Sequence, residues 1–499
     1  MRVQARLQGR ILSVLLAAGL VLPFVDKPVH IDDANFLRLA EGAVADPWRP
    51  HAIDINWQGT TERAFDVLSN PPGIAWWLAP VVEQPVWVQH LAMLPWLLLA
   101  LWGAAQLGRA LAGDDRHALL LMATSPVVVL AAQALTPDLP LLACTLAGIG
   151  GFLNGRGAWA LVAGSAVLFR YSGLCLWPLM GLIGLQTRRA SAALVVAPGL
   201  ALFAHDLHAY GQLHVAAMGS FQSVANTPWE ILRKGVAALA MLGGAGVLGV
   251  LTPRGWPGAL TGAAVGLTAG VLTGQGTLAL TMTVLCAASG GALLAGLRFR
   301  TPQDRLLLAW AGGGLFFLLL LRFAATRYWL PFLIAPTLAA LRLHPGPRRI
   351  AAVAVMQALL ALALSWDDRN LARAQQHLAE EVTSRGMGSF AGHWGWQHHM
   401  EAAGWRPLED DGPPDALHAE AVAPWPQQPD RVCAHMETLT VRDSFPGPRT
   451  HTAAGGGNLH AYVVSSAEVI ETYAPWSFSN EPYDIVHLWR CQTGSGTLE

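Results

Sequence analysis

The sequence predicts a polytopic α-helical membrane protein with a small C-terminal α/β domain, and two observations carry that prediction. Of the 499 residues, 53% are hydrophobic and only 13% are charged, about half the charged share of an ordinary soluble protein. Long apolar runs recur between residues 11 and 365, and they must be helices because lipid offers backbone N–H and C=O groups no partners. Since the composition becomes polar and turn-rich after this point, we expect domains at residues 1–365 and 366–499.

The apolar runs number about thirteen, and we expect about 11 to 13 transmembrane helices. Several runs between residues 139 and 187 are shorter than the roughly 20 residues that a full crossing needs, so some are re-entrant or broken. No A-x-A cleavage site follows the first run, which we interpret as a retained helix. The expected spans are 11–25, 86–108, 118–135, 139–153, 157–170, 172–187, 192–207, 235–251, 256–273, 277–297, 306–322, 328–342 and 350–365.

The arginines predict the orientation. With the N-terminus in the cytoplasm, the positive-inside rule is met by the connections that carry Arg109 and Arg116, Arg156, Arg188 and Arg189, Arg254, residues 298–305 and residues 342–349. We therefore expect the outer face to receive the loop 26–85 and the whole tail. We also expect the chain to be surrounded by membrane lipids, those of a bacterial inner membrane. The net charge of −1 offers no basic surface for a nucleic acid.

The first outer loop begins with two adjacent carboxylates, Asp32 and Asp33. Apolar residues at helical spacing predict an amphipathic helix over 32–44 at the membrane interface. Either acid could simply cap this helix, since Asp is a favoured N-cap, or it could do chemistry. Further candidates in the loop for contacts with a substrate are Trp57, Glu62 and Asn70.

Other charged groups are expected at the same outer boundary. Asp138, in the segment LTPDLPLL, is either another helix cap or a functional acid. Arg170 and Arg327 stand at the outer ends of apolar segments, where an unpaired Arg is costly. They could pair with the outer acids, or they could bind a phosphate, which suits the planar fork of Arg.

Five motifs in this order resemble the GT-C glycosyltransferases of family 39, the protein O-mannosyltransferase and aminoarabinose-transferase relatives. They are DD in the first outer loop, NPPG followed by two tryptophans, TPD, RYSGL and TRYWLP, and the likeness covers roughly residues 10–345. The chain departs from the family in having Asp-Asp where members often have Asp-Glu, and Asn-Pro-Pro where they have Lys-Pro-Pro or His-Pro-Pro. The acceptor therefore does not transfer from the family.

The resemblance implies a GT-C-like fold and a polyprenyl-phosphate-linked sugar donor, with an acceptor met outside the cytoplasm. The first-loop acid of the family maps onto Asp32 or Asp33, its proline-aspartate acid onto Asp138, and its late arginine-tyrosine pair onto Arg327 and Tyr328. A carboxylate base would activate the acceptor hydroxyl, while Arg327 and Arg170 would stabilise the leaving phosphate in a single, inverting displacement. No cofactor is implied, and the use of a divalent cation stays open.

A second class of function, a transporter or flippase of lipid-linked saccharides, would also hold a phosphate with outward arginines. Such transporters usually show paired repeats with interrupted helices in both halves, which this sequence lacks. A large acidic outer loop also has no evident role in transport, so the enzyme is the favoured interpretation.

In the tail, we expect strands at 439–441, 461–464 and 484–489 and helices at 371–382 and 397–403. Cys433 and Cys491 are the two cysteines of the tail and can form a disulfide if it faces an oxidising compartment. Three histidines, His393, His398 and His399, invite a metal interpretation, but no carboxylate or Cys at a matching spacing accompanies them, which favours surface and interface roles.

Overall fold

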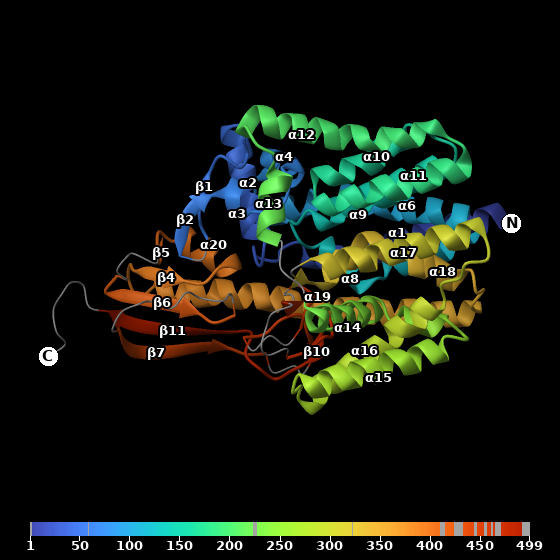
Figure 1. Cartoon of the computed structure of the whole chain (residues 1–499). Helices are drawn as coiled ribbons and strands as arrows, with labels where there is room; N and C mark the ends of the chain where they lie inside the picture. Colours follow the sequence, from blue (N-terminus) through green and yellow to red (C-terminus); the bar gives the residue numbers. More distant parts are fainter. Residues whose placement is uncertain are drawn as a thin grey trace.

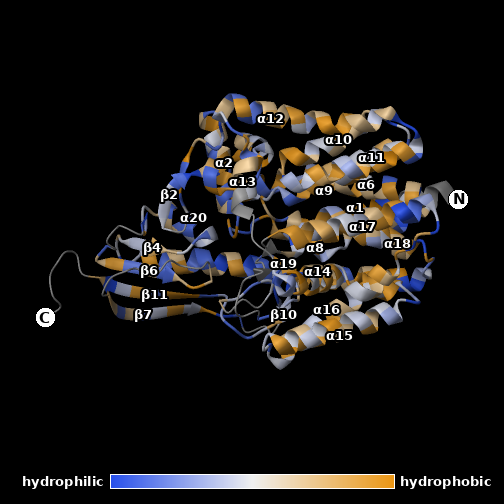
Figure 2. Cartoon of the chain, viewed as in Figure 1, coloured by the Kyte–Doolittle hydropathy of each residue, from blue (hydrophilic) through white to orange (hydrophobic). Residues whose placement is uncertain are grey.

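The computed structural model describes residues 2–57, 59–222, 227–321, 323–409, 415–423, 433–443, 447–453, 457–460, 463–464 and 471–491. A bundle of apolar helices forms one end of the molecule and a mixed sheet forms the other (Figure 1). The N-terminus lies at the far end of the bundle from this sheet, as Figure 1 shows. Coloured by hydropathy, the bundle is richer in apolar residues than the sheet end (Figure 2).

The helices of the first half run from the N-terminus to the outer loop and back through the bundle. In chain order they are α1 (Arg2–Val21), η1 (Leu22–Phe24), α2 (Asp33–Ala45), α3 (Ala64–Val67), α4 (Gly73–Leu78), η2 (Ala79–Val81), α5 (Val86–Leu91), α6 (Leu94–Leu107), η3 (Gly108–Ala112), α7 (Asp115–Ala123), α8 (Pro126–Ala131), α9 (Asp138–Leu153), α10 (Trp159–Gly164), η4 (Ser165–Leu168), η5 (Tyr171–Cys175), α11 (Leu176–Thr187), η6 (Ala190–Val196), α12 (Ala197–Tyr210) and α13 (His214–Gln222).

The helices of the second half complete the bundle and enter the tail. They are α14 (Pro228–Gly244), η7 (Leu248–Leu251), α15 (Trp256–Leu272), α16 (Thr277–Ala295), α17 (Pro302–Leu320), η8 (Thr326–Trp329), α18 (Leu330–Leu341), α19 (Pro347–Thr383) and α20 (Trp394–Ala402).

Five helical stretches among the described residues are long and apolar enough, by length and composition, to cross a membrane. Four further apolar helices are shorter, and the expected span 118–135 is divided into α7 and α8. The polytopic helical fold is therefore confirmed, while the number of crossings stays a prediction. The five stretches are Val86–Ala112, Ala190–Tyr210, Thr277–Ala295, Pro302–Leu320 and Pro347–Thr383.

The loops expected in the cytoplasm gather at one end of the bundle. Asp115 pairs with Arg10 and Arg109, and Arg342 donates a hydrogen bond to the carbonyl oxygen of Leu111 at 2.5 Å. The connections that carry Arg109 and Arg342 thus lie at the same end of the bundle as Arg10 of the N-terminal helix. The compartment that this end faces stays a prediction.

The tail forms a five-stranded sheet in the order β5-β4-β6-β11-β7, which is parallel at β5-β4-β6 and antiparallel beyond. Strands were expected at 439–441 and 484–489, and both lie in this sheet, as parts of β7 and β11. The expected strand 461–464 is described only at β9, since residues 461–462 lie outside the described residues. The strands of the chain are β1 (Asp54–Trp57), β2 (Thr60–Arg63), β3 (Phe323–Ala324), β4 (Ser389–Ala391), β5 (Arg406–Pro407), β6 (Leu417–Ala421), β7 (Cys433–Val441), β8 (Pro448–Arg449), β9 (Val463–Val464), β10 (Ser477–Phe478) and β11 (Asp484–Cys491).

The boundary expected after residue 365 lies inside a continuous helix. α19 is 37 residues long, and its first half packs on the bundle, while Leu378, Ala379 and Val382 join the core of the sheet (Figure 1). The composition changes at 365 because the helix leaves the bundle there, not because the backbone breaks. The tail is also tied to the bundle by β9, which pairs with β3 beside the TRYWLP segment.

Cys433 and Cys491 form a disulfide that joins the paired ends of β7 and β11, with Cα atoms 4.2 Å apart. This confirms the expected pairing, and Cys144, Cys175 and Cys286 are free.

Replacing both Cys433 and Cys491 by Ser is expected to destabilise the tail by about 2–4 kcal/mol, because the bond restricts the unfolded chain. Thermal unfolding of the purified full chain measures the effect, with Cys175→Ser as the control that removes a free thiol. Thiol titration of the unreduced wild type should find the three free cysteines and no more. Five reactive thiols, or equal unfolding temperatures, would contradict this prediction.

Candidate functional site

The two adjacent acids of the first outer loop point in different directions. The predicted helix is confirmed as α2, with its apolar face buried, and Asp32 occupies the N-cap position without capping by its side chain. Instead, Asp32 forms an ion pair with Arg327, in which Oδ2 of Asp32 lies 2.5 Å from Nη2 of Arg327. Ile31, just before it, has a φ of 49°. This left-handed conformation costs a β-branched residue energy, which is typical of functional sites.

Asp33, the second acid expected to be catalytic, is buried and hydrogen-bonded within the protein. Its side chain is 1% exposed, its Oδ1 accepts the backbone N–H of Leu135 at 2.7 Å, and its Oδ2 lies 3.4 Å from Nδ1 of His30. Asp33 therefore holds the segment that leads into Asp138, and it does not line the cavity described below.

Asp138 begins α9 and is buried at 1% exposure. Its Oδ1 is ion-paired with Arg170, whereas its Oδ2 is buried and has no hydrogen-bond partner. A buried carboxylate oxygen without a donor is costly, and Asp138 is one of the residues that line the cavity described below.

Tyr328 connects the two ion pairs. The guanidinium carbon of Arg170 lies 4.5 Å from the centre of the Tyr328 ring, and that of Arg327 lies 5.8 Å from it. Burial disfavours the charge of Arg327, but the carboxylates of Asp32 and Asp138 outweigh this, and the pKa of Arg327 is raised. The two acids and two arginines thus form one electrostatic unit around the tyrosine.

A cavity of about 190 Å³ opens beside this unit. Asp138, Arg170 and Tyr328 face it, and Asn70 of the NPPG motif lies on its wall. Its remaining wall is Ser69, Leu141, Tyr171, Ser172, Val215, Met218, Gly219, Phe317 and Leu321. It combines a charged wall with an apolar one, which is typical of a ligand-binding cavity.

The NPPG motif is held against the cavity by packing and by a buried histidine. Burial and the neighbouring His214 lower the pKa of His51 to about 3, so its neutral ring donates from Nε2 to the carbonyl oxygen of Asn70 at 2.9 Å. A Cβ at Gly73 would lie 2.4 Å from the carbonyl oxygen of Leu168, so only glycine allows α4 this close to the segment before Arg170.

The two expected phosphate-binding arginines differ in their surroundings. Arg170, expected as the second cation, lines the cavity, whereas Arg327, expected as the first, is not among the cavity residues and forms an ion pair with Asp32. Which of them binds a phosphate stays a prediction. Glu62 lies on β2, exposed, and accepts a hydrogen bond from Thr60 away from the cavity. The side chain of Trp57 lies outside the described residues.

We found no match to this chain among protein-family models or among curated proteins. Solved structures of ArnT from Cupriavidus metallidurans are similar to it. The ArnT structure bound to undecaprenyl phosphate has a TM-score of 0.46 and 15% identity, covering 75% of this chain and 72% of ArnT. The apo ArnT structure has a TM-score of 0.42 and 13% identity, covering 82% of this chain and 92% of ArnT.

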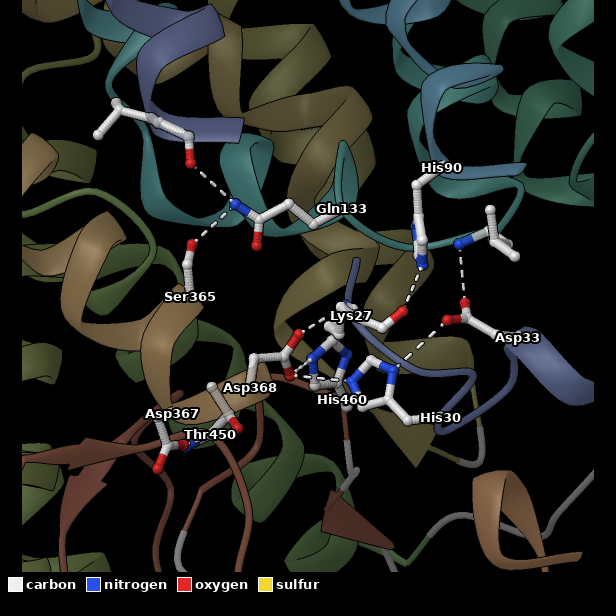
Figure 3. Close-up of polar contacts among 12 residues, drawn as sticks. Lys27, His30, Asp33, His90, Gln133, Ser365, Asp367, Asp368, Thr450 and His460 are labelled. Carbon is white, nitrogen blue, oxygen red and sulfur yellow. Dashed lines mark hydrogen bonds and ion pairs between the residues drawn. The ribbon is translucent and has the colours of Figure 1, made fainter. Parts of the chain in front are cut away.

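Sequence reasoning missed a buried polar cluster that joins the first loop to the tail, which we call the His30 network (Figure 3). It comprises Lys27, His30, Asp33, Asp368 and His460, all buried. Asp368 accepts from Lys27 Nζ at 2.8 Å, from His30 Nε2 at 3.1 Å and from His460 Nε2 at 2.7 Å. The sequence contained one indication of a special role for Lys27, which is one of only two lysines in the chain.

Within the described residues, one group brings three metal-ligand atoms within 4.8 Å of one another: His30, Asp368 and His460. Both histidine nitrogens already hydrogen-bond to Oδ1 of Asp368, and the ammonium of Lys27 neutralises the same carboxylate. The group therefore fits a hydrogen-bond network better than a cation site. His393, His398 and His399 belong to no such group among the described residues.

Replacing Lys27 by Met should destabilise the chain by about 3–5 kcal/mol, because the carboxylate of Asp368 then stays buried without its closest cation. Thermal unfolding of the purified protein measures this. The matched control is Arg373→Met on α19, where an ion pair with Asp26 is half exposed and contributes at most about 1 kcal/mol. If the two variants unfold at the same temperature, the network does not stabilise the fold as described.

Proposed function

We propose that this protein transfers a sugar from a polyprenyl-phosphate-linked donor to an acceptor hydroxyl at the outer face of the membrane. One observation carries the proposal: Asp138 and Arg170 line a cavity between apolar helices, and Oδ2 of Asp138 is buried there without a hydrogen-bond partner. The resemblance of the five motifs to family 39 supports the same reaction.

In this proposal, Asp138 is the general base. Its Oδ1 is fixed by Arg170, so Oδ2 is the oxygen free to accept the proton of an acceptor hydroxyl. Asp32 is not among the cavity residues, and it acts on Arg327 through their ion pair. The first-loop acid thus contributes through position and charge, and Asp138 through direct contact.

Arg170, with Tyr328 beside it, is the group that stabilises the leaving phosphate. Breaking the bond between the anomeric carbon and the phosphate oxygen raises the phosphate charge from about −1 to about −2. At the same time the proton of the acceptor hydroxyl moves to Asp138. The two acids and two arginines begin with no net charge, so proton transfer to Asp138 makes the protein side more positive as the phosphate becomes more negative.

We propose a single displacement at the anomeric carbon, which is supported by Asp138 being the one carboxylate among the described residues that line the cavity. A double displacement needs a second carboxylate as nucleophile, and Asp138 is the acid among the cavity residues given above. The acceptor would attack opposite the phosphate, and the product would have the inverted anomeric configuration.

An in vitro transfer assay tests the proposal against the transporter alternative. The purified protein in proteoliposomes is supplied with a panel of polyprenyl-phosphate sugars and a mixture of lipid, glycan and peptide acceptors. We expect one donor to be consumed, with release of the polyprenyl phosphate and a new glycosidic bond on an acceptor. Movement of a fluorescent lipid-linked saccharide between leaflets, with no bond broken, would favour the transporter.

A further inference from the structure

The segment that carries Asp138 is fixed from two sides. Gln133 donates from Nε2 to the carbonyl oxygen of Leu20 at 3.0 Å and to Oγ of Ser365 at 2.9 Å. Two residues later, Leu135 donates its backbone N–H to Asp33 (Figure 3). Between these contacts and Asp138 lie only Thr136 and Pro137, so the position of Asp33 sets the position of the proposed base.

Asp33 is itself held by His30, whose two ring nitrogens face two carboxylates. Nδ1 faces Oδ2 of Asp33 at 3.4 Å, and Nε2 faces Oδ1 of Asp368 on α19 at 3.1 Å. A neutral imidazole has one N–H and can donate to only one of these acceptors, whereas an imidazolium donates to both. Figure 3 shows the ring between the two acids.

The charges of the His30 network balance only when His30 is protonated. The groups that face it are Lys27 on its own segment, Asp33 on α2, Asp368 on α19 and His460 from the tail, while His90 on α5 reaches only the carbonyl oxygen of Lys27. With Lys27 and His30 positive and both acids negative, the buried cluster has no net charge. A neutral His30 would leave an uncompensated buried negative charge, which is costly.

The groups around His30 and His460 favour the same protonation states, a charged His30 and a neutral His460. Burial and the ammonium of Lys27 lower the pKa of His30, but the carboxylates of Asp368 and Asp33 outweigh them, so the pKa of His30 is raised above 6.5. Burial lowers the pKa of His460, which therefore remains neutral and donates to Asp368 from Nε2.

We propose that protonated His30 is a positioning residue for the Asp138 segment, and that it joins the tail, α19 and α2 into one proton-dependent support for the site. The inference rests on the proposed function only in the role given to Asp138. Since the pKa of His30 is raised on folding, the support is complete below pH 6.5 and is lost as the pH rises through the folded pKa.

Hydrogen exchange of the Leu135 amide in the full-length protein tests this, with no donor or acceptor present. After correction for the intrinsic rate, protection of this amide in the wild type should fall by about tenfold or more between about pH 6 and about pH 9. His30→Gln, which offers one donating nitrogen, should show the low protection at both pH values. The control His117→Gln, which removes a His–Asp pair with Asp114 on α7, should behave as the wild type.

The wild-type measurement decides the question even if His30→Gln does not fold. Protection of Leu135 that does not change with pH would overturn the proposal, and so would a stoichiometric divalent metal found by elemental analysis of the purified protein. Because exchange is measured without substrate, a failure to detect sugar transfer leaves this result intact, and the two proposals fail separately.

Discussion

Asp138→Asn is expected to reduce sugar transfer by about 10²–10⁴-fold, because it removes the proposed general base, the one carboxylate among the described residues that line the cavity. Asn has nearly the same shape and keeps a carbonyl oxygen for Arg170, so the protein level should stay near that of the wild type. Initial rates of transfer at saturating donor measure the effect.

The control for this variant is Asp66→Asn, which neutralises an exposed acid of the same outer loop that pairs with Arg63. It should retain full activity. If Asp138→Asn transfers sugar at the wild-type rate, the general base is another group, and Asp32 becomes the next acid to test.

Arg170→Lys should lower transfer by about 10- to 100-fold, the effect of losing charge-assisted hydrogen bonds. Lys keeps the charge but loses the planar fork that can hold Asp138 and a phosphate oxygen together. Because the phosphate gains charge in the transition state, kcat should fall more than KM for the donor rises.

Arg63→Lys, an exposed arginine in the same loop, is the matched control and should change neither constant. A variant Arg170→Lys that raises KM and leaves kcat unchanged would show that Arg170 binds the donor without stabilising the leaving group. Unchanged values of both constants would remove Arg170 from the site.

The sequence drew attention to Asp32 and Asp33 but could not predict that the two side chains have different contacts. Asp32 and Asp33 could not be distinguished by spacing alone, yet neighbouring residues on a helix differ in direction by about 100°. One therefore faces Arg327, and the other faces His30 and Leu135. The left-handed backbone conformation of Ile31, just before the two acids, is also not visible in the sequence.

Contacts between segments far apart in the sequence could not be predicted from the sequence either. Nothing in the spacing of Lys27, His30, Asp368 and His460 indicates that they meet, because α19 and the tail must fold back on the first loop to bring them together. By contrast, Cys433 and Cys491 could be paired from the sequence, since the tail offers no other cysteine.

The apolar runs predicted the helices but not where they break. The run 118–135 divides into α7 and α8 and then continues as the loop that carries Thr136 and Pro137. Irregular backbone at membrane depth is tolerated where it lines a cavity or is buried in protein. It is the segment after α8, and not the break between α7 and α8, that leads into Asp138.

A structure determined with a bound polyprenyl phosphate tests the central claim most directly. We expect the phosphate in the cavity lined by Asp138, Arg170 and Tyr328, with an oxygen within hydrogen-bond distance of the Arg170 guanidinium. A phosphate bound elsewhere, with the Asp138 cavity empty and Oδ2 still unpartnered, would contradict the assignment of this cavity as the site of sugar transfer.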